Sequence, residues 1–182
     1  MKVVVLDRDG VINQDSDNYI KSADEWLPID GSIDAIATLS KSGYKVVVAT
    51  NQSGISRNLF DEDTLAQIHH KLCSMVEESG GLLDGIFYCP HTPDQHCLCR
   101  KPGTGLLEQI ETAFSCSLAG SYFVGDSYKD VQAALAFGCK PILLRTGKGI
   151  ATEKRIRQEG LLDIPVYDNL AAAVKQKLVI DV

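Results

Sequence analysis

The sequence has no long apolar run, no run of basic residues and no repeated or low-complexity segment. The first absence excludes a membrane-spanning helix, which needs about 20 consecutive apolar residues. The second, together with a formal net charge of −6, argues against a nucleic-acid partner. The amino terminus also lacks the pattern of a secretory signal peptide, so we expect a cytoplasmic protein without a membrane partner.

What the sequence contains is ordinary for a globular protein: 182 residues, 45% of them apolar and 23% charged. This length favours one domain with a full core, and we expect residues 1–182 to form it. The six cysteines should be free thiols in a reducing cytoplasm. Three of them, Cys89, Cys97 and Cys99, fall within eleven residues, and this spacing favours a metal site.

Strand-like and helix-like segments alternate along the chain. Apolar, mostly β-branched runs predict strands at 3–6, 45–49, 85–89, 121–124, 140–144 and 164–167. Helical spacing between caps and glycines predicts helices at about 32–42, 62–79, 104–114, 128–137, 152–159 and from 169. The alternation predicts an α/β fold with a three-layer, doubly wound parallel sheet. The polar segment 13–21 is too short for a large cap domain, and we expect it to form a flap.

Polar groups follow several predicted strands, at the edge where an open α/β sheet binds its ligands. Asp7 and Asp9 follow the first strand, and Thr50 follows the second. Asp126 follows the fourth strand, and Lys101 precedes a helix. Asp7 and Asp126 supply hard oxygen ligands suited to Mg²⁺. Lys101 and the Thr50 hydroxyl can neutralise a tetrahedral dianion that Asp7 attacks, while Asp9 protonates the leaving oxygen and then activates water.

A short loop gathers metal-binding side chains in the pattern Cys-x-His-x5-Cys-x-Cys. The four expected ligands are Cys89, His91, Cys97 and Cys99. Three thiolates and an imidazole would form a closed, structural Zn²⁺ site in this zinc loop, residues 89–99. His96 is an alternative to His91, although its position beside a ligand cysteine makes it less suitable. The metal would order the loop and hold Arg100 and Lys101 at the phosphate pocket.

Three further titratable residues have open or minor roles. His69 and His70 lie on the second predicted helix, where surface histidines are common, so we predict no function for either. Asp130 follows the fourth strand by a few residues. It suits two roles equally well, as a support for the metal site or as an acid in the first turn of a helix.

These motifs resemble those of the haloacid dehalogenase superfamily over nearly the whole chain. Residues 7–11, Asp-Arg-Asp-Gly-Val, match its first motif, Thr50 its second, Lys101 its third and residues 125–130 its fourth. The resemblance implies that Asp7 is a nucleophile that forms an aspartyl-phosphate and that Asp9 is the acid/base. It also implies Mg²⁺ bound by Asp7, the Asp9 carbonyl and Asp126. The second aspartate of the first motif favours phosphate-ester hydrolysis over dehalogenation.

Within this superfamily the chain resembles the branch of heptose bisphosphate phosphatases and histidinol-phosphate phosphatases. The resemblance rests on residues 7–13, 50–55, 88–91 and 97–102. It implies substrate contacts from Asp15, Asn18, Tyr19, Thr50, Asn51, Gln52, Ser53, Arg100 and Lys101. Arg100 would recognise a second phosphate and Lys101 would steady the transferred one. The chain departs from the branch in a short zinc loop and in Ser127, where some heptose enzymes carry lysine.

The resemblance therefore implies a Mg²⁺-dependent phosphatase that removes the C7 phosphate of D-glycero-D-manno-heptose 1,7-bisphosphate. It would serve ADP- or GDP-heptose synthesis, for lipopolysaccharide or an S-layer, as a monomer with this sugar bisphosphate as its only partner. Histidinol-phosphate phosphatase is the alternative within the branch. A phospho-accepting receiver module also places Asp, Thr and Lys at strand ends, but it needs neither Asp9 nor a zinc loop.

Overall fold

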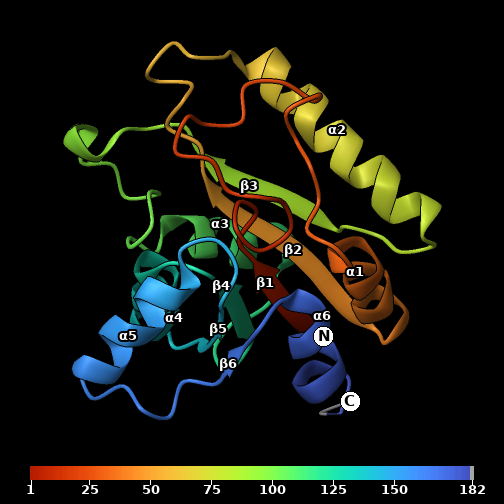
Figure 1. The fold of residues 1–182 in the computed structure, drawn as a ribbon, viewed down its shortest axis with the longest axis vertical. Coiled ribbons are helices and arrows are strands. Elements are labelled where there is room, and N and C mark those ends of the chain that lie inside the picture. The colour runs from red at the N-terminus through yellow and green to blue at the C-terminus, as the bar shows by residue number, and fades with distance from the viewer. Residues whose placement is uncertain (181–182) are drawn as a thin grey trace.

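The computed structural model, which describes residues 1–180, contains one six-stranded parallel sheet (Figure 1). Its strands lie in the order β3-β2-β1-β4-β5-β6. They are β1 (Lys2–Leu6), β2 (Tyr44–Asn51), β3 (Gly85–Cys89), β4 (Tyr122–Gly125), β5 (Lys140–Leu144) and β6 (Val166–Tyr167). The order reverses direction on either side of β1, which is the arrangement of a doubly wound sheet. The predicted α/β fold is confirmed.

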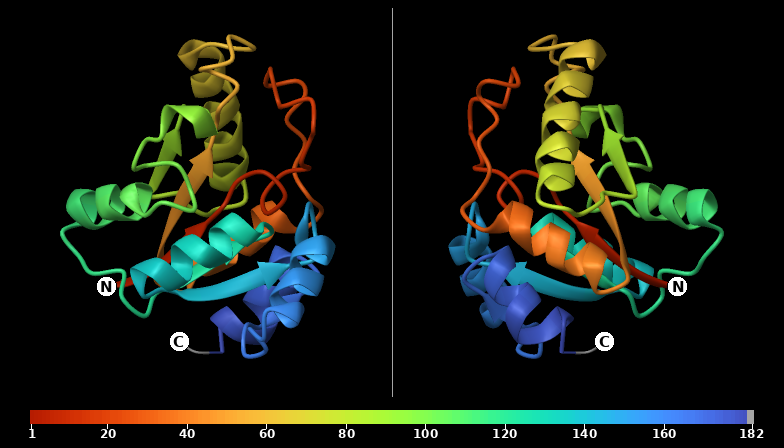
Figure 2. Two further views of the ribbon diagram at one scale, coloured as in Figure 1. Left: turned by 90° about the vertical axis from the view of Figure 1, so that its left-hand side faces the viewer. Right: turned by 90° about the vertical axis from the view of Figure 1, so that its right-hand side faces the viewer.

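Helices cover both faces of this sheet, as the two side views in Figure 2 show. They are α1 (Ser32–Lys41), α2 (Glu62–Glu78), α3 (Gly105–Phe114), α4 (Tyr128–Phe137), α5 (Gly149–Gln158) and α6 (Leu170–Ala173). Helices α1, α2 and α6 pack on one face, and α3, α4 and α5 pack on the other. No helix within residues 1–180 is long and apolar enough to cross a membrane.

The alternation of side chains in β1 explains why a continuous apolar run is needed there. Val4 and Leu6 belong to the core under α1 and α2, whereas Val3 and Val5 belong to the core under α3 and α4. A strand covered on both faces buries every side chain, each contributing about 1.5–3 kcal/mol. The strand is therefore fixed firmly, and so is the residue that follows it, Asp7.

The register of the sheet brings the polar strand ends together. Leu6 pairs with Val48 of β2 and with Val124 of β4. The residues just beyond these pairs are Asp7, Thr50 and Asp126, and they consequently lie at one edge of the sheet. This is the arrangement that the sequence predicts.

Two predicted boundaries differ from the structure at the carboxyl end of the chain. Helix α5 begins at Gly149, three residues before the predicted start, because a glycine-rich first turn gives little helical signal. Strand β6 begins at Val166 rather than at 164. Pro165 lacks an N–H group for the ladder, although its carbonyl accepts from Leu143 N at 3.0 Å.

The predicted flap, residues 13–21, has neither helix nor strand and continues as a loop to residue 31 (Figure 2). Asn13 forms a single antiparallel bridge with Pro28. Trp26 is fully buried and anchors the loop in the core. Lys71 of α2 donates to the carbonyls of Ala23 and Trp26 at 2.7 and 2.9 Å, so the loop is fastened at its far end.

Candidate active site

A cavity of about 750 Å³ lies at the carboxyl edge of the sheet. Eleven of the predicted catalytic, metal and substrate residues line it: Asp7, Asp9, Asp15, Tyr19, Thr50, Asn51, Gln52, Ser53, Arg100, Lys101 and Asp126. Asn18 is exposed and is absent from the lining. Its carbonyl accepts from the Lys21 ammonium at 2.9 Å, within the turn at the outer end of the flap.

Lys101 joins two carboxylates at the bottom of the cavity. Its Nζ lies 2.9 Å from Asp7 Oδ1 and 2.6 Å from Asp130 Oδ1, and it donates to the Ala49 carbonyl at 2.8 Å. Although burial opposes the charge, the Asp130 and Asp7 carboxylates raise the pKa of Lys101. The residue is therefore a fixed ammonium that holds one oxygen of Asp7 in place.

Asp7, Asp126 and Asp130 each place a carboxylate oxygen within 4.8 Å of the others, and all three are buried. Burial and the charge of Asp130 raise the pKa of Asp7 to about 7. Burial, then Asp130 and Asp7, raise the pKa of Asp126 to about 8. Three buried carboxylates share one ammonium, so negative charge exceeds positive. This donor set fits a hard divalent cation such as Mg²⁺.

The two carboxylate oxygens of Asp130 have different partners. One oxygen pairs with Lys101, and the other accepts from Ser127 N at 3.0 Å and Ser127 Oγ at 2.7 Å. The second set closes a capping box at the start of α4. Asp130 is thus an acid of the first helical turn, and it also positions the lysine of the site.

The loop after β5 encloses Asp126, a role that the sequence analysis missed. Lys148 N donates to Asp126 Oδ2 at 2.7 Å, and Thr146 Oγ1 donates to the Gly10 carbonyl at 2.6 Å. Gly10 and Gly147 both have positive φ, and a Cβ atom at either would overlap the Asp126 carboxylate. The available signal was the glycine-flanked Lys148 directly after the fifth predicted strand, at the same edge of the sheet.

Asp9 is held very differently from Asp7. Its Oδ1 accepts from Arg8 Nη2 at 2.8 Å and from Asn13 Nδ2 at 2.9 Å, and its Oδ2 accepts from Gln52 Nε2 at 2.8 Å. Although burial opposes the charge, Arg8 and these amide donors hold the pKa of Asp9 below its ordinary value. The two aspartates of the first motif therefore have opposite electrostatic surroundings.

Two predicted substrate contacts have structural partners inside the site. The Gln52 amide donates to Asp9 and to Thr50 Oγ1, the latter at 2.9 Å. Because Thr50 Oγ1 accepts this bond, its own hydrogen remains available for a ligand. The Asn51 side chain accepts from Lys101 N at 3.0 Å and donates to Lys101 O at 3.1 Å. Asn51 thus fixes the backbone of the lysine across the cavity.

Positively charged residues gather in the wall of the cavity beyond Lys101. Arg100, Lys129 and Lys148 all line it. Burial, followed by the charges of Arg100 and Lys148, lowers the pKa of Lys129. Lys148 has a partial counter-charge in Asp15 of the flap, 3.2 Å away. Cations that face one another across a cavity favour an anionic ligand between them.

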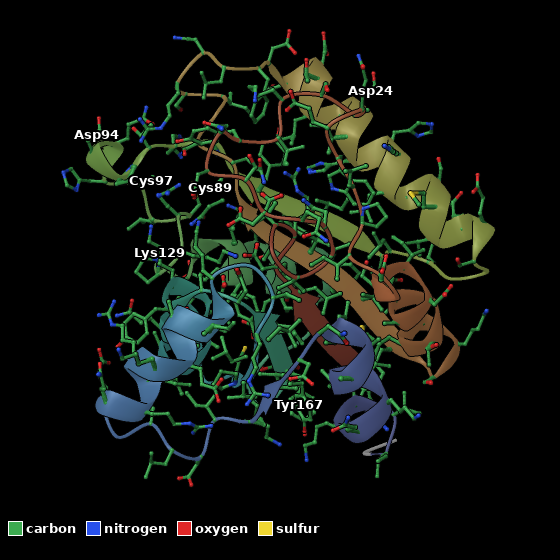
Figure 3. All side chains as sticks on the ribbon, viewed as in Figure 1. Asp24, Cys89, Asp94, Cys97, Lys129 and Tyr167 are labelled. Atoms are coloured by element: carbon green, nitrogen blue, oxygen red, sulfur yellow. The ribbon has the colours of Figure 1, made fainter. Side chains whose placement is uncertain are left out.

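The four predicted ligands of the zinc loop place their ligand atoms within 4.8 Å of one another. Figure 3 labels two of them, Cys89 and Cys97. Cys89 Sγ lies 3.1 Å from Cys99 Sγ and 3.5 Å from Cys97 Sγ, and none of these thiols is in a disulfide. His91 Nδ1 lies 3.3 Å from Cys99 Sγ. A closed set of three sulfurs and one imidazole nitrogen is the donor set of a structural zinc site, so the residues fit the metal.

The same loop is connected to the active site. Arg100 Nη1 donates to the His91 carbonyl at 3.0 Å, which ties the arginine of the cavity to a ligand of the cluster. His96 is exposed at the end of a 3₁₀ turn (Pro93–Gln95) and does not belong to the cluster. The geometry therefore favours His91 over His96 as the fourth residue of the cluster.

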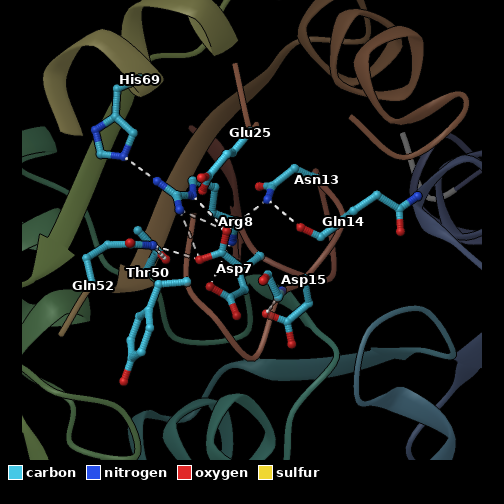
Figure 4. A network of polar contacts seen from close by, with 12 residues as sticks. Asp7, Arg8, Asn13, Gln14, Asp15, Glu25, Thr50, Gln52 and His69 are labelled. Atoms are coloured by element: carbon cyan, nitrogen blue, oxygen red, sulfur yellow. Dashed lines mark hydrogen bonds and ion pairs between the residues drawn. The ribbon is translucent and has the colours of Figure 1, made fainter. Parts of the chain in front are cut away.

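One histidine that the sequence analysis set aside lies against the site. His69 of α2 is half-buried, and its Nε2 lies 3.3 Å from Arg8 Nη1 (Figure 4). His70 is exposed. Helical position alone did not distinguish the two histidines, since Arg8 and His69 are 61 positions apart in the chain. Only their packing places one of them beside Arg8.

Comparisons with known proteins agree with this geometry. The HAD-hydrolase-like family model matches residues 98–173. The D-glycero-beta-D-manno-heptose-1,7-bisphosphate 7-phosphatase of Pseudomonas putida is 51% identical over 97% of this chain and 99% of its own. The enzyme of the same name from Pseudomonas aeruginosa is 50% identical, with 97% of both chains covered.

A solved structure gives the same result. The D,D-heptose 1,7-bisphosphate phosphatase of B. bronchiseptica, crystallised with magnesium and phosphate, superposes with a TM-score of 0.93. It is 47% identical in sequence, and the match covers 100% of both chains. The similarity thus extends over the sheet, the flap and the metal-binding loop alike.

Proposed function

Since the chain belongs to the family of D-glycero-beta-D-manno-heptose-1,7-bisphosphate 7-phosphatases, which are HAD-like hydrolases, we propose that it removes the C7 phosphate of the β-anomer of this sugar. The chemistry rests on two aspartates that line one cavity and have different partners. Asp7 forms an ion pair with Lys101, and Asp9 forms an ion pair with Arg8. One is placed to attack and the other to exchange protons.

Mg²⁺ would be held by the carboxylates of Asp7 and Asp126 and by the backbone carbonyl of Asp9. When bound, the ion supplies positive charge that offsets the carboxylates and the phosphoryl oxygens. The B. bronchiseptica relative was crystallised with magnesium, which supports this choice of metal. Lys101 fixes Asp7 for attack, and the free hydrogen of the Thr50 hydroxyl donates to a phosphoryl oxygen.

In the first step, a carboxylate oxygen of Asp7 forms a bond to phosphorus while the bond from phosphorus to the C7 oxygen breaks. The electron pair goes to the C7 oxygen, which takes a proton from the acid form of Asp9. Because Arg8 and the amide donors hold the pKa of Asp9 low, the negative charge of the bound phosphate has to raise that pKa before this step. In the second step, a water oxygen forms a bond to phosphorus and gives its proton to Asp9, while the bond from phosphorus to the Asp7 oxygen breaks and its electron pair returns to the Asp7 carboxylate. Inorganic phosphate is released. Asp9 ends as it began, and Asp7 is free again.

The second phosphate of the substrate would bind beside Arg100, with Lys129 and Lys148 adjoining. The lowered pKa of Lys129 supports this, because an anion there would relieve the repulsion among the three cations. Histidinol phosphate carries an amine in place of a second phosphate and would add to the repulsion. Asp15 and Tyr19 of the flap line the same cavity and would contact the sugar, together with Ser53.

The zinc loop would bind one Zn²⁺ through Cys89, His91, Cys97 and Cys99. The role of this metal is structural, because all four positions are filled by side chains. It would set the position of Arg100 through the His91 carbonyl. We place the enzyme in the cytoplasm, in the synthesis of the heptose precursor of lipopolysaccharide, and expect it to act as a monomer.

Phosphate release in the presence of Mg²⁺ tests the proposal. The substrates are the β- and α-anomers of D-glycero-D-manno-heptose 1,7-bisphosphate and histidinol phosphate. We expect kcat/KM to be highest for the β-anomer of the bisphosphate. Arg100→Ala should reduce the preference of the enzyme for this bisphosphate over a heptose 7-phosphate that lacks the second phosphate. Equal or faster turnover of histidinol phosphate would contradict the proposed substrate and leave the phosphatase chemistry standing.

A further inference from the structure

Arg8 of the first motif is a fully buried cation with an unusual pair of contacts. Its Nε and Nη2 atoms donate to the Asp9 carboxylate at 3.1 and 2.8 Å, so one edge of the guanidinium binds the proposed acid/base. The remaining terminal nitrogen, Nη1, points the other way and meets His69 Nε2 at 3.3 Å. Arg8 thus connects His69 to Asp9, and Figure 4 shows its contact with His69.

His69 is placed for this contact by its helix. It lies on the same α2 turn as Ile68, a core residue, and its ring packs against Tyr88 of β3 at 6.0 Å between centroids. Burial, and then the charge of Arg8, lowers the pKa of His69 to about 3, so the imidazole is neutral. Because Nε2 faces an N–H donor, it must be the acceptor, and the ring proton resides on Nδ1.

The geometry points to His69 as a positioning residue for the acid/base step. By accepting from Arg8 Nη1, it fixes the plane of the guanidinium, and the guanidinium in turn fixes the Asp9 carboxylate. A buried donor without an acceptor is costly, so the guanidinium would turn away from its present plane if the imidazole were lost. This inference rests on the proposed function, because it takes Asp9 to be the acid/base.

Two substrates with different leaving groups distinguish a positioning role of His69 from a role in packing alone. A sugar alkoxide needs the proton of Asp9 when the ester bond breaks, whereas p-nitrophenolate is acidic enough to leave without it. The kinetic constant kcat/KM covers the steps up to that first bond cleavage and excludes the later attack of water. A misplaced Asp9 therefore lowers kcat/KM for a sugar phosphate and spares p-nitrophenyl phosphate, whereas a general structural fault lowers both.

The experiment compares His69→Leu, His69→Gln and His70→Leu with the wild-type enzyme, at saturating Mg²⁺ and on both substrates. We expect His69→Leu to lower kcat/KM for the heptose bisphosphate about tenfold, and for p-nitrophenyl phosphate less than twofold. His69→Gln places an amide oxygen near the position of Nε2 and should restore most of the loss. His70→Leu changes an exposed neighbour on the same helix and should leave both values unchanged.

If His69→Leu does not fold, His69→Asn takes its place, because its side chain is polar but too short to reach Arg8. Equal losses on the two substrates, or no loss on the sugar phosphate, would overturn the inference. If the wild-type enzyme does not hydrolyse heptose bisphosphate, the proposed substrate is wrong instead. The comparison would then be made with whichever alkyl phosphate the enzyme hydrolyses, so the two failures remain distinct.

Discussion

At the scale of single residues, the first motif shows how two aspartates two positions apart acquire different chemistry. Asp7 is buried beside another carboxylate, which raises its pKa to about 7, although Lys101 opposes the rise. Asp9 accepts from an arginine and two amides, which lower its pKa despite burial. Without a metal ion, these surroundings leave Asp9 ionised and Asp7 partly protonated. A divalent cation beside Asp7 would lower the pKa of Asp7 and restore the carboxylate that attacks.

Replacing the nucleophile tests this assignment most directly. Asp7→Asn should lower phosphatase turnover at least about a thousandfold, because an amide does not attack phosphorus. The fold should be retained and the melting temperature should not fall, since the neutral amide relieves repulsion from Asp126 and Asp130. Phosphate release and thermal unfolding, measured side by side, check both parts. Turnover within tenfold of wild type would exclude Asp7 as the nucleophile.

The buried imidazole predicts a dependence of stability on pH. The pKa of His69 falls from 6.5 to about 3 on folding, so between these values the unfolded state binds more protons. The free energy of unfolding therefore rises with pH in this window, and the contribution of His69 is lost as the pH falls below 6.5. Urea unfolding of the wild type and His69→Gln at pH 7 and pH 5 measures it.

We expect the wild type to lose more stability than His69→Gln between these two pH values. His70→Gln, at the exposed neighbouring position, should behave like the wild type. An identical loss in His69→Gln and the wild type would show that the imidazole is accessible to water and titrates normally.

At the scale of elements, the loops after the strands carry most of the site. The zinc loop contains one 3₁₀ turn and little core of its own, yet it holds Arg100 and leads directly into Lys101. The loop after β5 closes on Asp126 through Lys148 N. Such segments need additional contacts to become rigid, which the Asp126 carboxylate supplies to the loop after β5 and which a bound metal ion would supply to the zinc loop.

Replacement of one predicted zinc ligand should release the metal and make the zinc loop mobile, while the sheet stays folded. We expect one zinc per chain in the wild type and none in Cys97→Ser, with faster amide exchange confined to residues 89–101. Activity should fall as well, because Arg100 and Lys101 lose their support. Metal analysis and hydrogen exchange measure these effects.

Cys73→Ser, which alters a thiol of α2 outside the cluster, is the matched control and should keep its zinc. A wild-type protein free of zinc, or Cys97→Ser with a full complement, would contradict the predicted site.

At the scale of the whole molecule, burial concentrates negative charge at one edge of the sheet. Asp7, Asp126 and Asp130 are all buried there, and Lys101 is the ammonium between them. Any ligand that binds only the folded state stabilises the whole chain by mass action, by about 2.7 kcal/mol at one hundred times its Kd. The metal site is thus coupled to the stability of the entire fold.

Magnesium should therefore raise the melting temperature of the wild type, and raise it much less in Asp126→Asn. Without the ion the variant should be at least as stable as the wild type, because one of the mutually repelling carboxylates is gone. Differential scanning calorimetry with and without Mg²⁺ measures both effects. Asp24→Asn, in the loop that follows the flap, serves as the control. An equal rise in Asp126→Asn would remove this residue from the predicted ligands.

The sequence by itself determined the sheet and the composition of its functional edge. Val3 to Leu6 form a strand because β-branched runs suit burial on both faces, and parallel strands must end at a common edge. The Cys/His cluster that could bind a metal ion was also predictable, since its four residues lie within an eleven-residue segment. Local pattern and topology are sufficient for such features.

Only the tertiary structure decided how the side chains of the site divide their work. Gln52 and Asn51, which the resemblance assigns to the substrate, also bond to Asp9 and to the Lys101 backbone. His69 reaches Arg8 although the two residues are 61 positions apart in the chain. Such contacts depend on the packing of α2 against the sheet and on side-chain conformations, and no spacing along the sequence encodes either.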